Sequence, residues 1–316
     1  MRVLDFIGFD AQQQAQLKTA GADNIIPAAA ATAKDYADLD AIFGWGEAGP
    51  AIVKQAPHLR YLQTLSAGVD YLPLGLLAKR QVEVANASGL HGDAIAETVL
   101  AFLLAFTRQI TFSNESGKAA TFWNGRRERT KMHTLAGQSA LIYGAGSIGQ
   151  TIGAMLQMHG VTTYGVNTRG ETVPGFKALY ANGEEKERLG KVDFVINAMP
   201  LTPQTRHFFN HEFFAAMASD AIFVNIGRGP EVATTDLVAA LQSGTIAGAG
   251  LDVFEEEPLP ETSPLWSCPN LVMTPHTSGT VSNIKTRLLR IIIPNLQAIS
   301  NGKDLVRNRV NLHRGY

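Results

Sequence analysis

Short apolar runs rich in β-branched residues alternate with helical patterns along almost the whole chain. In the first hundred residues these runs are RVLDFIGF, LDAIFG, LRYLQTLS and VEVANAS. Six more follow, namely SALIYG, VTTYGVN, DFVINAM, AIFVNIG, IAGAGLDVF and LVMTP, each bounded by Gly, Pro or a helical segment. Strands that alternate with helices build parallel sheets covered by helices. The pattern therefore predicts an α/β protein with two Rossmann-like, doubly wound parallel-sheet domains and an active-site cleft between them.

The two domains are expected to divide the chain unequally. We assign residues 1–98 to a substrate-binding domain and residues 99–284 to a dinucleotide-binding domain. Residues 285–316 have helical spacing and no further strand, so we expect them to return and complete the first domain. The stretch AETVLAFLLAFTRQI, residues 96–110, is apolar on all sides, which favours a helix between the lobes or at a subunit contact. From this stretch we predict a homodimer.

Composition and charge narrow the classes of partner. The chain has 316 residues, of which 45% are hydrophobic and 17% charged, enough for two ordinary cores. With 27 basic and 28 acidic residues, the chain is expected to bind a small molecule and neither nucleic acid nor a membrane. We expect no metal ion. The single cysteine, the absence of a secretory signal in MRVLDFIGFD and the lack of a bilayer-spanning run predict a cytoplasmic protein.

The glycines of YGAGSIGQ form the pattern G-x-G-x-x-G directly after one predicted strand and directly before a helical run. Gly144 permits a tight turn, Gly146 lets the backbone approach a pyrophosphate, and Gly149 lets helix and strand pack closely. The helix N-terminus then offers free N–H groups to the phosphate charge. Such a loop can also be an ordinary tight turn, but its place between strand and helix predicts a dinucleotide site.

The stretch GVNTR ends the next predicted strand, about 20 residues after the glycine loop, where an acid normally binds the adenine ribose. Asn167 in place of the acid removes the repulsion of a 2′-phosphate. Thr168 adds a hydroxyl donor, and Arg169 offers a fork suited to phosphate. We therefore predict that NADP(H) is preferred over NAD(H). The alternative is that Arg169 points into solvent and that NAD is bound.

Three downstream side chains each follow a predicted strand of the same sheet: Arg228 in NIGRGPE, Glu257 in LDVFEEEPLP and His276 in MTPHTSG. Doubly wound folds place their ligands at the carboxyl ends of strands. Arg228 could pair with a substrate carboxylate and His276 could exchange a proton, while Glu257 could hold the imidazole and favour its charged form. Singly, each has an ordinary structural explanation, so the prediction of a catalytic triad depends on all three occurring together.

Over nearly its whole length the sequence resembles the D-isomer-specific 2-hydroxyacid dehydrogenases. The matching stretches are GAGSIG, NIGRG, GLDVFEEEP and TPHTSG, with LSAGVDYLP and NASGLHGDAIAE in the first lobe and RNRVNLHRGY in the tail. The resemblance implies that Arg228 binds and polarises a keto acid, that His276 is the acid/base, and that Glu257 is its partner. It also implies that the substrate carboxylate binds the backbone of three residues of the first lobe: Ala67, Gly68 and Val69.

The resemblance further implies that Asp252 and the backbone near Ile226 hold the nicotinamide amide. It places other cofactor contacts at Ser147, Ile148, Pro200 and Ser278. The sequence also departs from the family pattern. Asn167 resembles NADPH-using members, Ala233 replaces a common helix-capping Asp or Asn, and His91 occupies a loop position that is more often apolar and could touch substrate.

These features predict an NADP-dependent D-2-hydroxyacid dehydrogenase, a reductase of small 2-keto acids. Two alternatives share the scaffold. Dinucleotide-sensing corepressors can retain the whole triad but usually carry extra tails for their partners, and phosphite dehydrogenases use the same fold. A formate dehydrogenase on this scaffold is disfavoured, because formate enzymes lack the acid found here as Glu257. Residue types alone do not choose among glyoxylate, hydroxypyruvate and bulkier branched or aromatic keto acids, nor do they fix the physiological direction.

Overall fold

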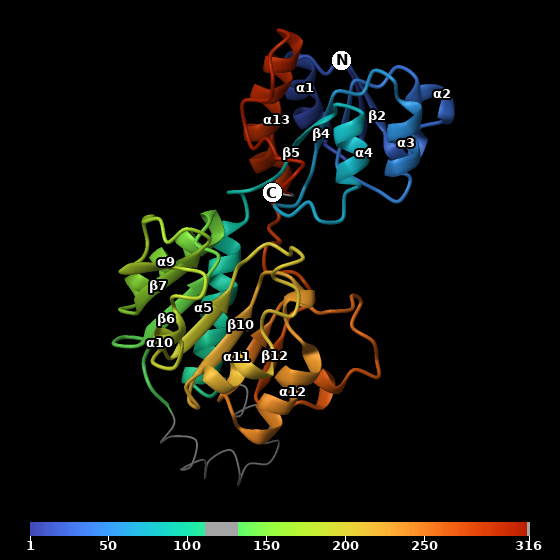
Figure 1. Cartoon of the computed structure of the whole chain (residues 1–316). Coiled ribbons are helices and arrows are strands. Elements are labelled where there is room, and N and C mark those ends of the chain that lie inside the picture. The colour runs from blue at the N-terminus through green and yellow to red at the C-terminus, as the bar shows by residue number, and fades with distance from the viewer. Residues whose placement is uncertain (111–131, 315–316) are drawn as a thin grey trace. The chain divides into compact units, whose positions relative to one another are not determined.

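The computed structural model describes residues 1–110 and 132–314 and divides into two compact units. One unit comprises Met1–His91 and Thr280–Tyr316, and the other is Gly92–Gly279. Each unit holds one all-parallel sheet, which confirms the predicted α/β class (Figure 1). The division falls a few residues before the predicted limits, so helix α5 (Gly92–Thr107) lies wholly in the second unit.

The first unit has a five-stranded sheet in the order β2-β1-β3-β4-β5. Its strands alternate their side chains between two cores, as parallel strands covered on both faces do. On β1, Val3 faces the core that includes α13, and Leu4 faces the opposite core. The strands are β1 (Arg2–Asp5), β2 (Asn24–Pro27), β3 (Ala41–Phe43), β4 (Tyr61–Gln63) and β5 (Glu83–Ala85). The helices are α1 (Ala11–Thr19), α2 (Ala33–Tyr36), α3 (Gly49–Gln55), α4 (Leu74–Lys79) and α13 (Ile284–Ser300).

The second unit has a seven-stranded sheet in the order β12-β11-β10-β9-β6-β7-β8. Six of these strands coincide with the six predicted runs, and the short edge strand β8 was not predicted. The strands are β6 (Ser139–Tyr143), β7 (Thr162–Asn167), β8 (Ala178–Ala181), β9 (Phe194–Asn197), β10 (Ile222–Asn225), β11 (Gly248–Leu251) and β12 (Leu271–Met273). Besides α5, the helices are α9 (Ser147–Met158), α10 (Lys186–Leu189), α11 (His211–Ala216) and α12 (Thr234–Ser243).

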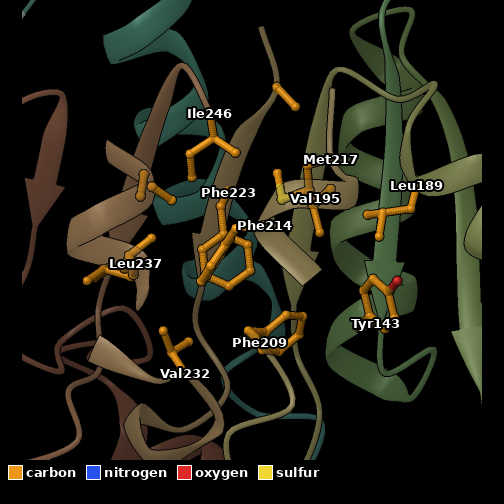
Figure 2. Close-up of a cluster of buried hydrophobic side chains, with 14 of the residues drawn as sticks. Tyr143, Leu189, Val195, Phe209, Phe214, Met217, Phe223, Val232, Leu237 and Ile246 are labelled. Atoms are coloured by element: carbon orange, nitrogen blue, oxygen red, sulfur yellow. The ribbon is translucent and has the colours of Figure 1, made fainter. Parts of the chain in front are cut away.

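Both faces of the second sheet are buried. Ala140 and Ile142 of β6 pack into the core that contains α5 and α9, while Leu141 and Tyr143 face the core of the opposite side. That second core contains a group of aromatic rings in edge-to-face and tilted contacts, including Phe209, Phe214 and Phe223 (Figure 2). Contacts of this kind add to the energy gained by burial.

Helix α5 accounts for most of the apolar stretch from which a subunit contact was predicted. Its residues Val99, Phe102, Leu103 and Phe106 are buried inside the second unit itself. The sequence argument for a subunit interface is therefore wrong for these side chains, and the homodimer stays a prediction without that support. Among the described residues, the helices are all too short or too polar to cross a membrane.

The strand order of the second sheet indicates where a ligand can bind. From β6 the sheet proceeds to β7 and β8 in one direction and to β9, β10, β11 and β12 in the other, so the order reverses between β6 and β9. Ligands of open parallel sheets bind outside the carboxyl ends of the strands at such a switch point. The glycine loop follows β6, and the three predicted catalytic side chains follow β10, β11 and β12 at the same edge.

Candidate active site

The glycine loop has the geometry that its sequence predicts. Gly144 has φ of +91°, a left-handed conformation that favours glycine, and a Cβ there would lie 2.5 Å from the carbonyl oxygen of Ala198. A Cβ on Gly149 would lie 2.2 Å from the carbonyl oxygen of Gly144, so helix α9 packs directly on the turn.

The N-terminus of α9 suits a phosphate group. Its N-cap is Gly146, no side chain caps the first turn, and a Cβ on Gly146 would meet no atom within 4 Å. The backbone N–H groups of Ser147, Ile148 and Gly149 thus begin a twelve-residue helix beside open space. The residues fit the pyrophosphate of a dinucleotide.

At the end of β7, polar side chains hydrogen-bond to nearby residues of the same segment, which the sequence analysis did not predict. The Oδ1 atom of Asn167 accepts hydrogen bonds from the N–H groups of Arg169 (3.0 Å) and Gly170 (2.5 Å), and its Nδ2 donates to the carbonyl oxygen of Glu171 (2.9 Å). The Arg169 guanidinium lies 3.3 Å from a carboxylate oxygen of Glu171, and both side chains are about two-thirds exposed, at 67% and 66%. Thr168 is also exposed. Glu171 was not predicted, and its charge opposes that of Arg169 where a 2′-phosphate would bind.

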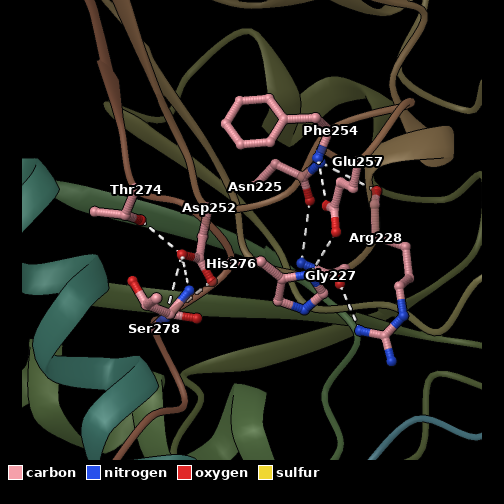
Figure 3. A network of polar contacts seen from close by, with 10 residues as sticks. Asn225, Gly227, Arg228, Asp252, Phe254, Glu257, Thr274, His276 and Ser278 are labelled. Carbon is pink, nitrogen blue, oxygen red and sulfur yellow. Dashed lines mark hydrogen bonds and ion pairs between the residues drawn. The ribbon is translucent and has the colours of Figure 1, made fainter. Parts of the chain in front are cut away.

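His276 and Glu257 form the pair that their order in the sequence predicts. Glu257 Oε2 lies 2.7 Å from His276 Nδ1, and its Oε1 accepts a hydrogen bond from the Phe254 N–H at 2.9 Å (Figure 3). The contact at Nδ1 leaves Nε2 of a half-exposed ring (50%) as the nitrogen that can exchange a proton with a ligand. His276 has φ of +53°, a costly conformation for a residue with a side chain, and its N–H bonds to the carbonyl oxygen of Asp252 (2.8 Å).

Asp252 holds the loop on which His276 sits. Its buried Oδ1 accepts hydrogen bonds from the Thr274 hydroxyl (2.6 Å) and from the N–H groups of Thr277 (2.8 Å) and Ser278 (3.1 Å), and its Oδ2 accepts from Ser278 as well (Figure 3). Hydrogen bonds to an ionised acceptor are the stronger kind. The structure therefore shows Asp252 and Ser278 bracing the histidine loop, in addition to the cofactor contact that the sequence implies.

Arg228 leaves the loop after β10. Its Nη1 donates to the carbonyl oxygen of Gly227 (2.9 Å), and its own carbonyl oxygen accepts from Asn225 Nδ2 (3.1 Å). Nearby, the N–H of buried Ile226 bonds to the carbonyl oxygen of Asn197 (3.1 Å), and Pro200 is exposed on the loop after β9. The carboxyl edge of the second unit thus gathers the residues predicted from the downstream motifs and from the glycine loop.

The carboxylate-binding loop predicted after β4 belongs to the first unit. The carbonyl oxygens of Ala67 and Gly68 accept hydrogen bonds from Asn86 Nδ2 (2.9 Å) and Ser66 Oγ (2.8 Å). Across residues 1–110 and 132–314, the N–H groups of Ala67, Gly68 and Val69 find no acceptor in the protein, so they could bind a carboxylate. The ring of His91 lies beside this loop, with Nε2 3.0 Å from the Leu65 carbonyl oxygen.

A second His–Glu pair with a contact of the same length was not predicted. His207 Nε2 lies 2.7 Å from Glu255 Oε1, and Glu255 Oε2 accepts from the N–H of Thr234 at 2.8 Å. This bond replaces the cap missing at Ala233, which is the N-cap of α12 and makes no side-chain hydrogen bond. Burial alone would raise the pKa of Glu255, but the bonds from Thr234 and His207 outweigh it and lower that pKa.

Glu231 is a further residue that the sequence analysis did not single out. It is fully buried, and its Oε2 accepts hydrogen bonds from the Arg228 N–H (2.8 Å) and Asn197 Nδ2 (2.6 Å). Burial raises the pKa of Glu231 to about 7, against the opposing effects of the bonds from Asn197, Arg228 and Thr205 and of the Arg228 charge. A carboxyl group that titrates near neutral pH therefore touches the main chain of Arg228.

Residues 100–278 match the model of the D-isomer specific 2-hydroxyacid dehydrogenase NAD-binding domain. The chain belongs to this family. It is 34% identical over 290 residues to glyoxylate/hydroxypyruvate reductase B of Citrobacter koseri, a match that covers 88% of this chain and 86% of that protein. A family member from Aeromonas salmonicida has a similar crystal structure, with 28% identity, a TM-score of 0.82 and coverage of 98% of both chains.

A second structure adds a bound cofactor to the comparison. The NADPH-dependent glyoxylate/hydroxypyruvate reductase of Sinorhizobium meliloti, solved with NADP and sulfate, is 25% identical, with a TM-score of 0.80 and coverage of 99% of both chains. As a 2-hydroxyacid dehydrogenase, the present chain is an oxidoreductase that binds a nicotinamide dinucleotide.

Proposed function

We propose that this 2-hydroxyacid dehydrogenase reduces a small 2-keto acid to the D-2-hydroxy acid and that it prefers NADP(H) to NAD(H). The observation that carries the proposal is the 2.7 Å contact between His276 and Glu257 at the sheet edge where the glycine loop and the Arg228 loop also end. A bound nicotinamide cofactor supplies the hydride. The proton and the alignment of the substrate come from the protein.

Each side chain has one task in this proposal. Arg228 offers a charged fork to the keto acid and polarises its carbonyl group. His276, protonated, donates the proton from Nε2 to the carbonyl oxygen, which becomes the hydroxyl. Glu257 accepts at Nδ1, so it orients the ring and stabilises its positive charge. The free N–H groups of Ala67–Val69 are proposed to receive the substrate carboxylate.

The preference for NADP(H) is supported by the end of β7. No acid occupies position 167 to repel a 2′-phosphate, and the exposed guanidinium of Arg169 can reach an anion. The reductase from Sinorhizobium meliloti, to which this chain is similar, is NADPH-dependent. The ion pair with Glu171 opposes the preference and makes it moderate, because a phosphate must compete with that carboxylate. A cytoplasmic location is part of the proposal and is supported by the single cysteine.

The decisive experiment measures NADPH and NADH oxidation with a panel of acids: glyoxylate, hydroxypyruvate, a branched keto acid and phenylpyruvate. We expect oxidation with at least one of them and a higher kcat/KM with NADPH. A cofactor that binds but is oxidised by none of these acids would favour a sensing role, and NADP⁺ reduction by phosphite would favour the phosphite dehydrogenase alternative. Equal or better use of NADH would overturn the cofactor preference alone.

A further inference from the structure

The carboxyl group of Glu231 lies directly behind Arg228. Glu231 ends a short 3-10 helix, Gly229–Glu231, that connects the Arg228 loop to α12. Its Oε2 receives the Arg228 N–H at 2.8 Å, and a Cβ added to Gly227 would lie 2.6 Å from that same oxygen. The carboxyl group is therefore packed against the backbone of Gly227 and the N–H of Arg228. Within the described residues its Oε1 accepts no hydrogen bond, although the residue is fully buried.

Asn197 and Asn225 extend this contact into a network around the Arg228 main chain. Asn197 Nδ2 donates to both Glu231 Oε2 (2.6 Å) and Asn225 Oδ1 (2.9 Å). Asn225 in turn donates from Nδ2 to the Arg228 carbonyl oxygen (3.1 Å) and accepts from the Gly227 N–H (3.1 Å). The peptide groups before and after the Arg228 α-carbon are thus both fixed by buried side chains. Because the backbone fixes where a side chain starts, this network constrains the direction in which the Arg228 side chain leaves the main chain.

Among the described residues, the side chains that hydrogen-bond to the Glu231 carboxyl group carry no charge. Asn197 faces it from β9, Thr205 from the loop after β9, and Asn225 bounds the network at the end of β10. The charge that acts on the Glu231 carboxyl group is that of Arg228. The ring of His207 contacts the carboxylate of Glu255 instead. Burial outweighs these bonds and raises the pKa of Glu231 to about 7, so the carboxyl group loses its charge when the solution becomes mildly acidic.

We propose that Glu231 is a positioning residue for substrate binding: ionised, it holds the Arg228 main chain in place, and protonated, it releases that hold. The reason is that a hydrogen bond to an ionised carboxylate is roughly twice as strong as one to a neutral acceptor. The affinity for a 2-keto acid then falls as the pH decreases through neutral. This inference rests on the proposed function, in which Arg228 binds the keto acid.

The test compares the unmodified protein with Glu231→Gln and with a matched control, Glu255→Gln, across the range from about pH 5.5 to 8.5 around the shifted pKa. In the unmodified protein, KM for the best keto acid should rise about threefold to tenfold on acidification, the size expected from weakening one charge-assisted bond. Glu231→Gln should show the high KM for the keto acid at every pH, with the KM for NADPH unchanged. Glu255→Gln removes an equally hydrogen-bonded carboxylate outside the network and should keep the unmodified profile.

Two results would overturn the proposal: a KM for the keto acid that is independent of pH in the unmodified protein, or a variant Glu231→Gln that retains the unmodified pH dependence. The first requires no variant, so a misfolded mutant would not block the test. Calorimetric binding of oxalate to the NADPH-loaded protein provides a readout without turnover. If oxalate binds with the predicted pH dependence but no keto acid is reduced, then the proposed reaction fails and the role of Glu231 stands.

Discussion

Replacing the buried Glu231 by Gln is expected to stabilise the folded protein at neutral pH and above. Burial raises the pKa of this carboxyl group from its ordinary value of 4.5 to about 7. Between these two pH values the folded protein keeps a proton that the unfolded chain has released, so raising the pH favours unfolding. At about 1.4 kcal/mol for each pKa unit, the unmodified protein loses roughly 3 kcal/mol of stability over this range, and the loss levels off above about pH 7. Gln has nearly the same shape as Glu and no charge, so the variant should not lose this stability as the pH rises.

The assay is urea unfolding followed by circular dichroism, for both proteins at several pH values. The difference between their unfolding free energies removes the titrations that both share. This difference should move in favour of Glu231→Gln by roughly 3 kcal/mol as the pH rises from about 4.5 to 8. Glu255→Gln should behave differently: its difference should be nearly constant above about pH 5 and should change only in more acidic solution, because the pKa of Glu255 is lowered from 4.5 in the folded protein and its charged form is the one that stabilises. A difference for Glu231→Gln that stays constant with pH would refute the reasoning.

The remaining predictions concern catalysis, cofactor choice and assembly. His276→Ala should lower kcat by roughly a hundredfold to ten-thousandfold on the best keto acid. The control His207→Ala breaks a His–Glu contact of the same 2.7 Å length and should change kcat little. Similar losses in both variants would argue against His276 as the proton donor. Glu257→Gln should lower kcat on the best keto acid, because it removes the carboxylate that orients the His276 ring, and an unchanged kcat would contradict the pairing. Arg169→Ala should weaken NADPH binding about tenfold in a fluorescence titration and leave NADH binding nearly unchanged, while Glu171→Gln should tighten NADPH binding. If Arg169→Ala weakened the binding of both cofactors equally, a contact between Arg169 and the 2′-phosphate would be excluded. Light scattering should give the mass of a homodimer, and a monomer would remove that prediction alone.

Sequence patterns predicted both sheets because their central strands are buried on two faces and therefore appear as continuous apolar runs. They missed β2 and β8, two edge strands of four residues each, in which every residue keeps some exposure to solvent. Neither strand is a long enough run to be distinguished from a loop. The apolar helix α5 shows a different limit. Its composition indicated deep burial, but the choice between its own unit and a partner's surface depends on packing that composition does not contain.

The candidate site also contains residues that the sequence predicts and residues that it does not. Arg228, Glu257 and His276 were predictable because each follows a strand within a short motif, and parallel strands bring such positions to one edge. Glu231 follows Gly and Pro in a loop, where a carboxylate usually faces water. Instead it is fully buried and hydrogen-bonded to Asn197, which lies 34 residues away in the sequence. A pKa that is raised by burial in the folded protein cannot be inferred from local sequence.

The discontinuity of the first unit has a consequence for the order in which the protein can fold during synthesis. The ribosome makes residues 1–91 first, yet one core of their sheet is completed by Leu288, Ile292 and Leu296 of α13. The open side of β5 is likewise paired by a late segment, with the Val310 N–H bonded to the Val84 carbonyl oxygen at 2.8 Å. Meanwhile the second unit, Gly92–Gly279, is continuous and can complete its own core as soon as it emerges. The part of the chain that is made first is therefore the last to finish folding, and until then it exposes an apolar sheet face.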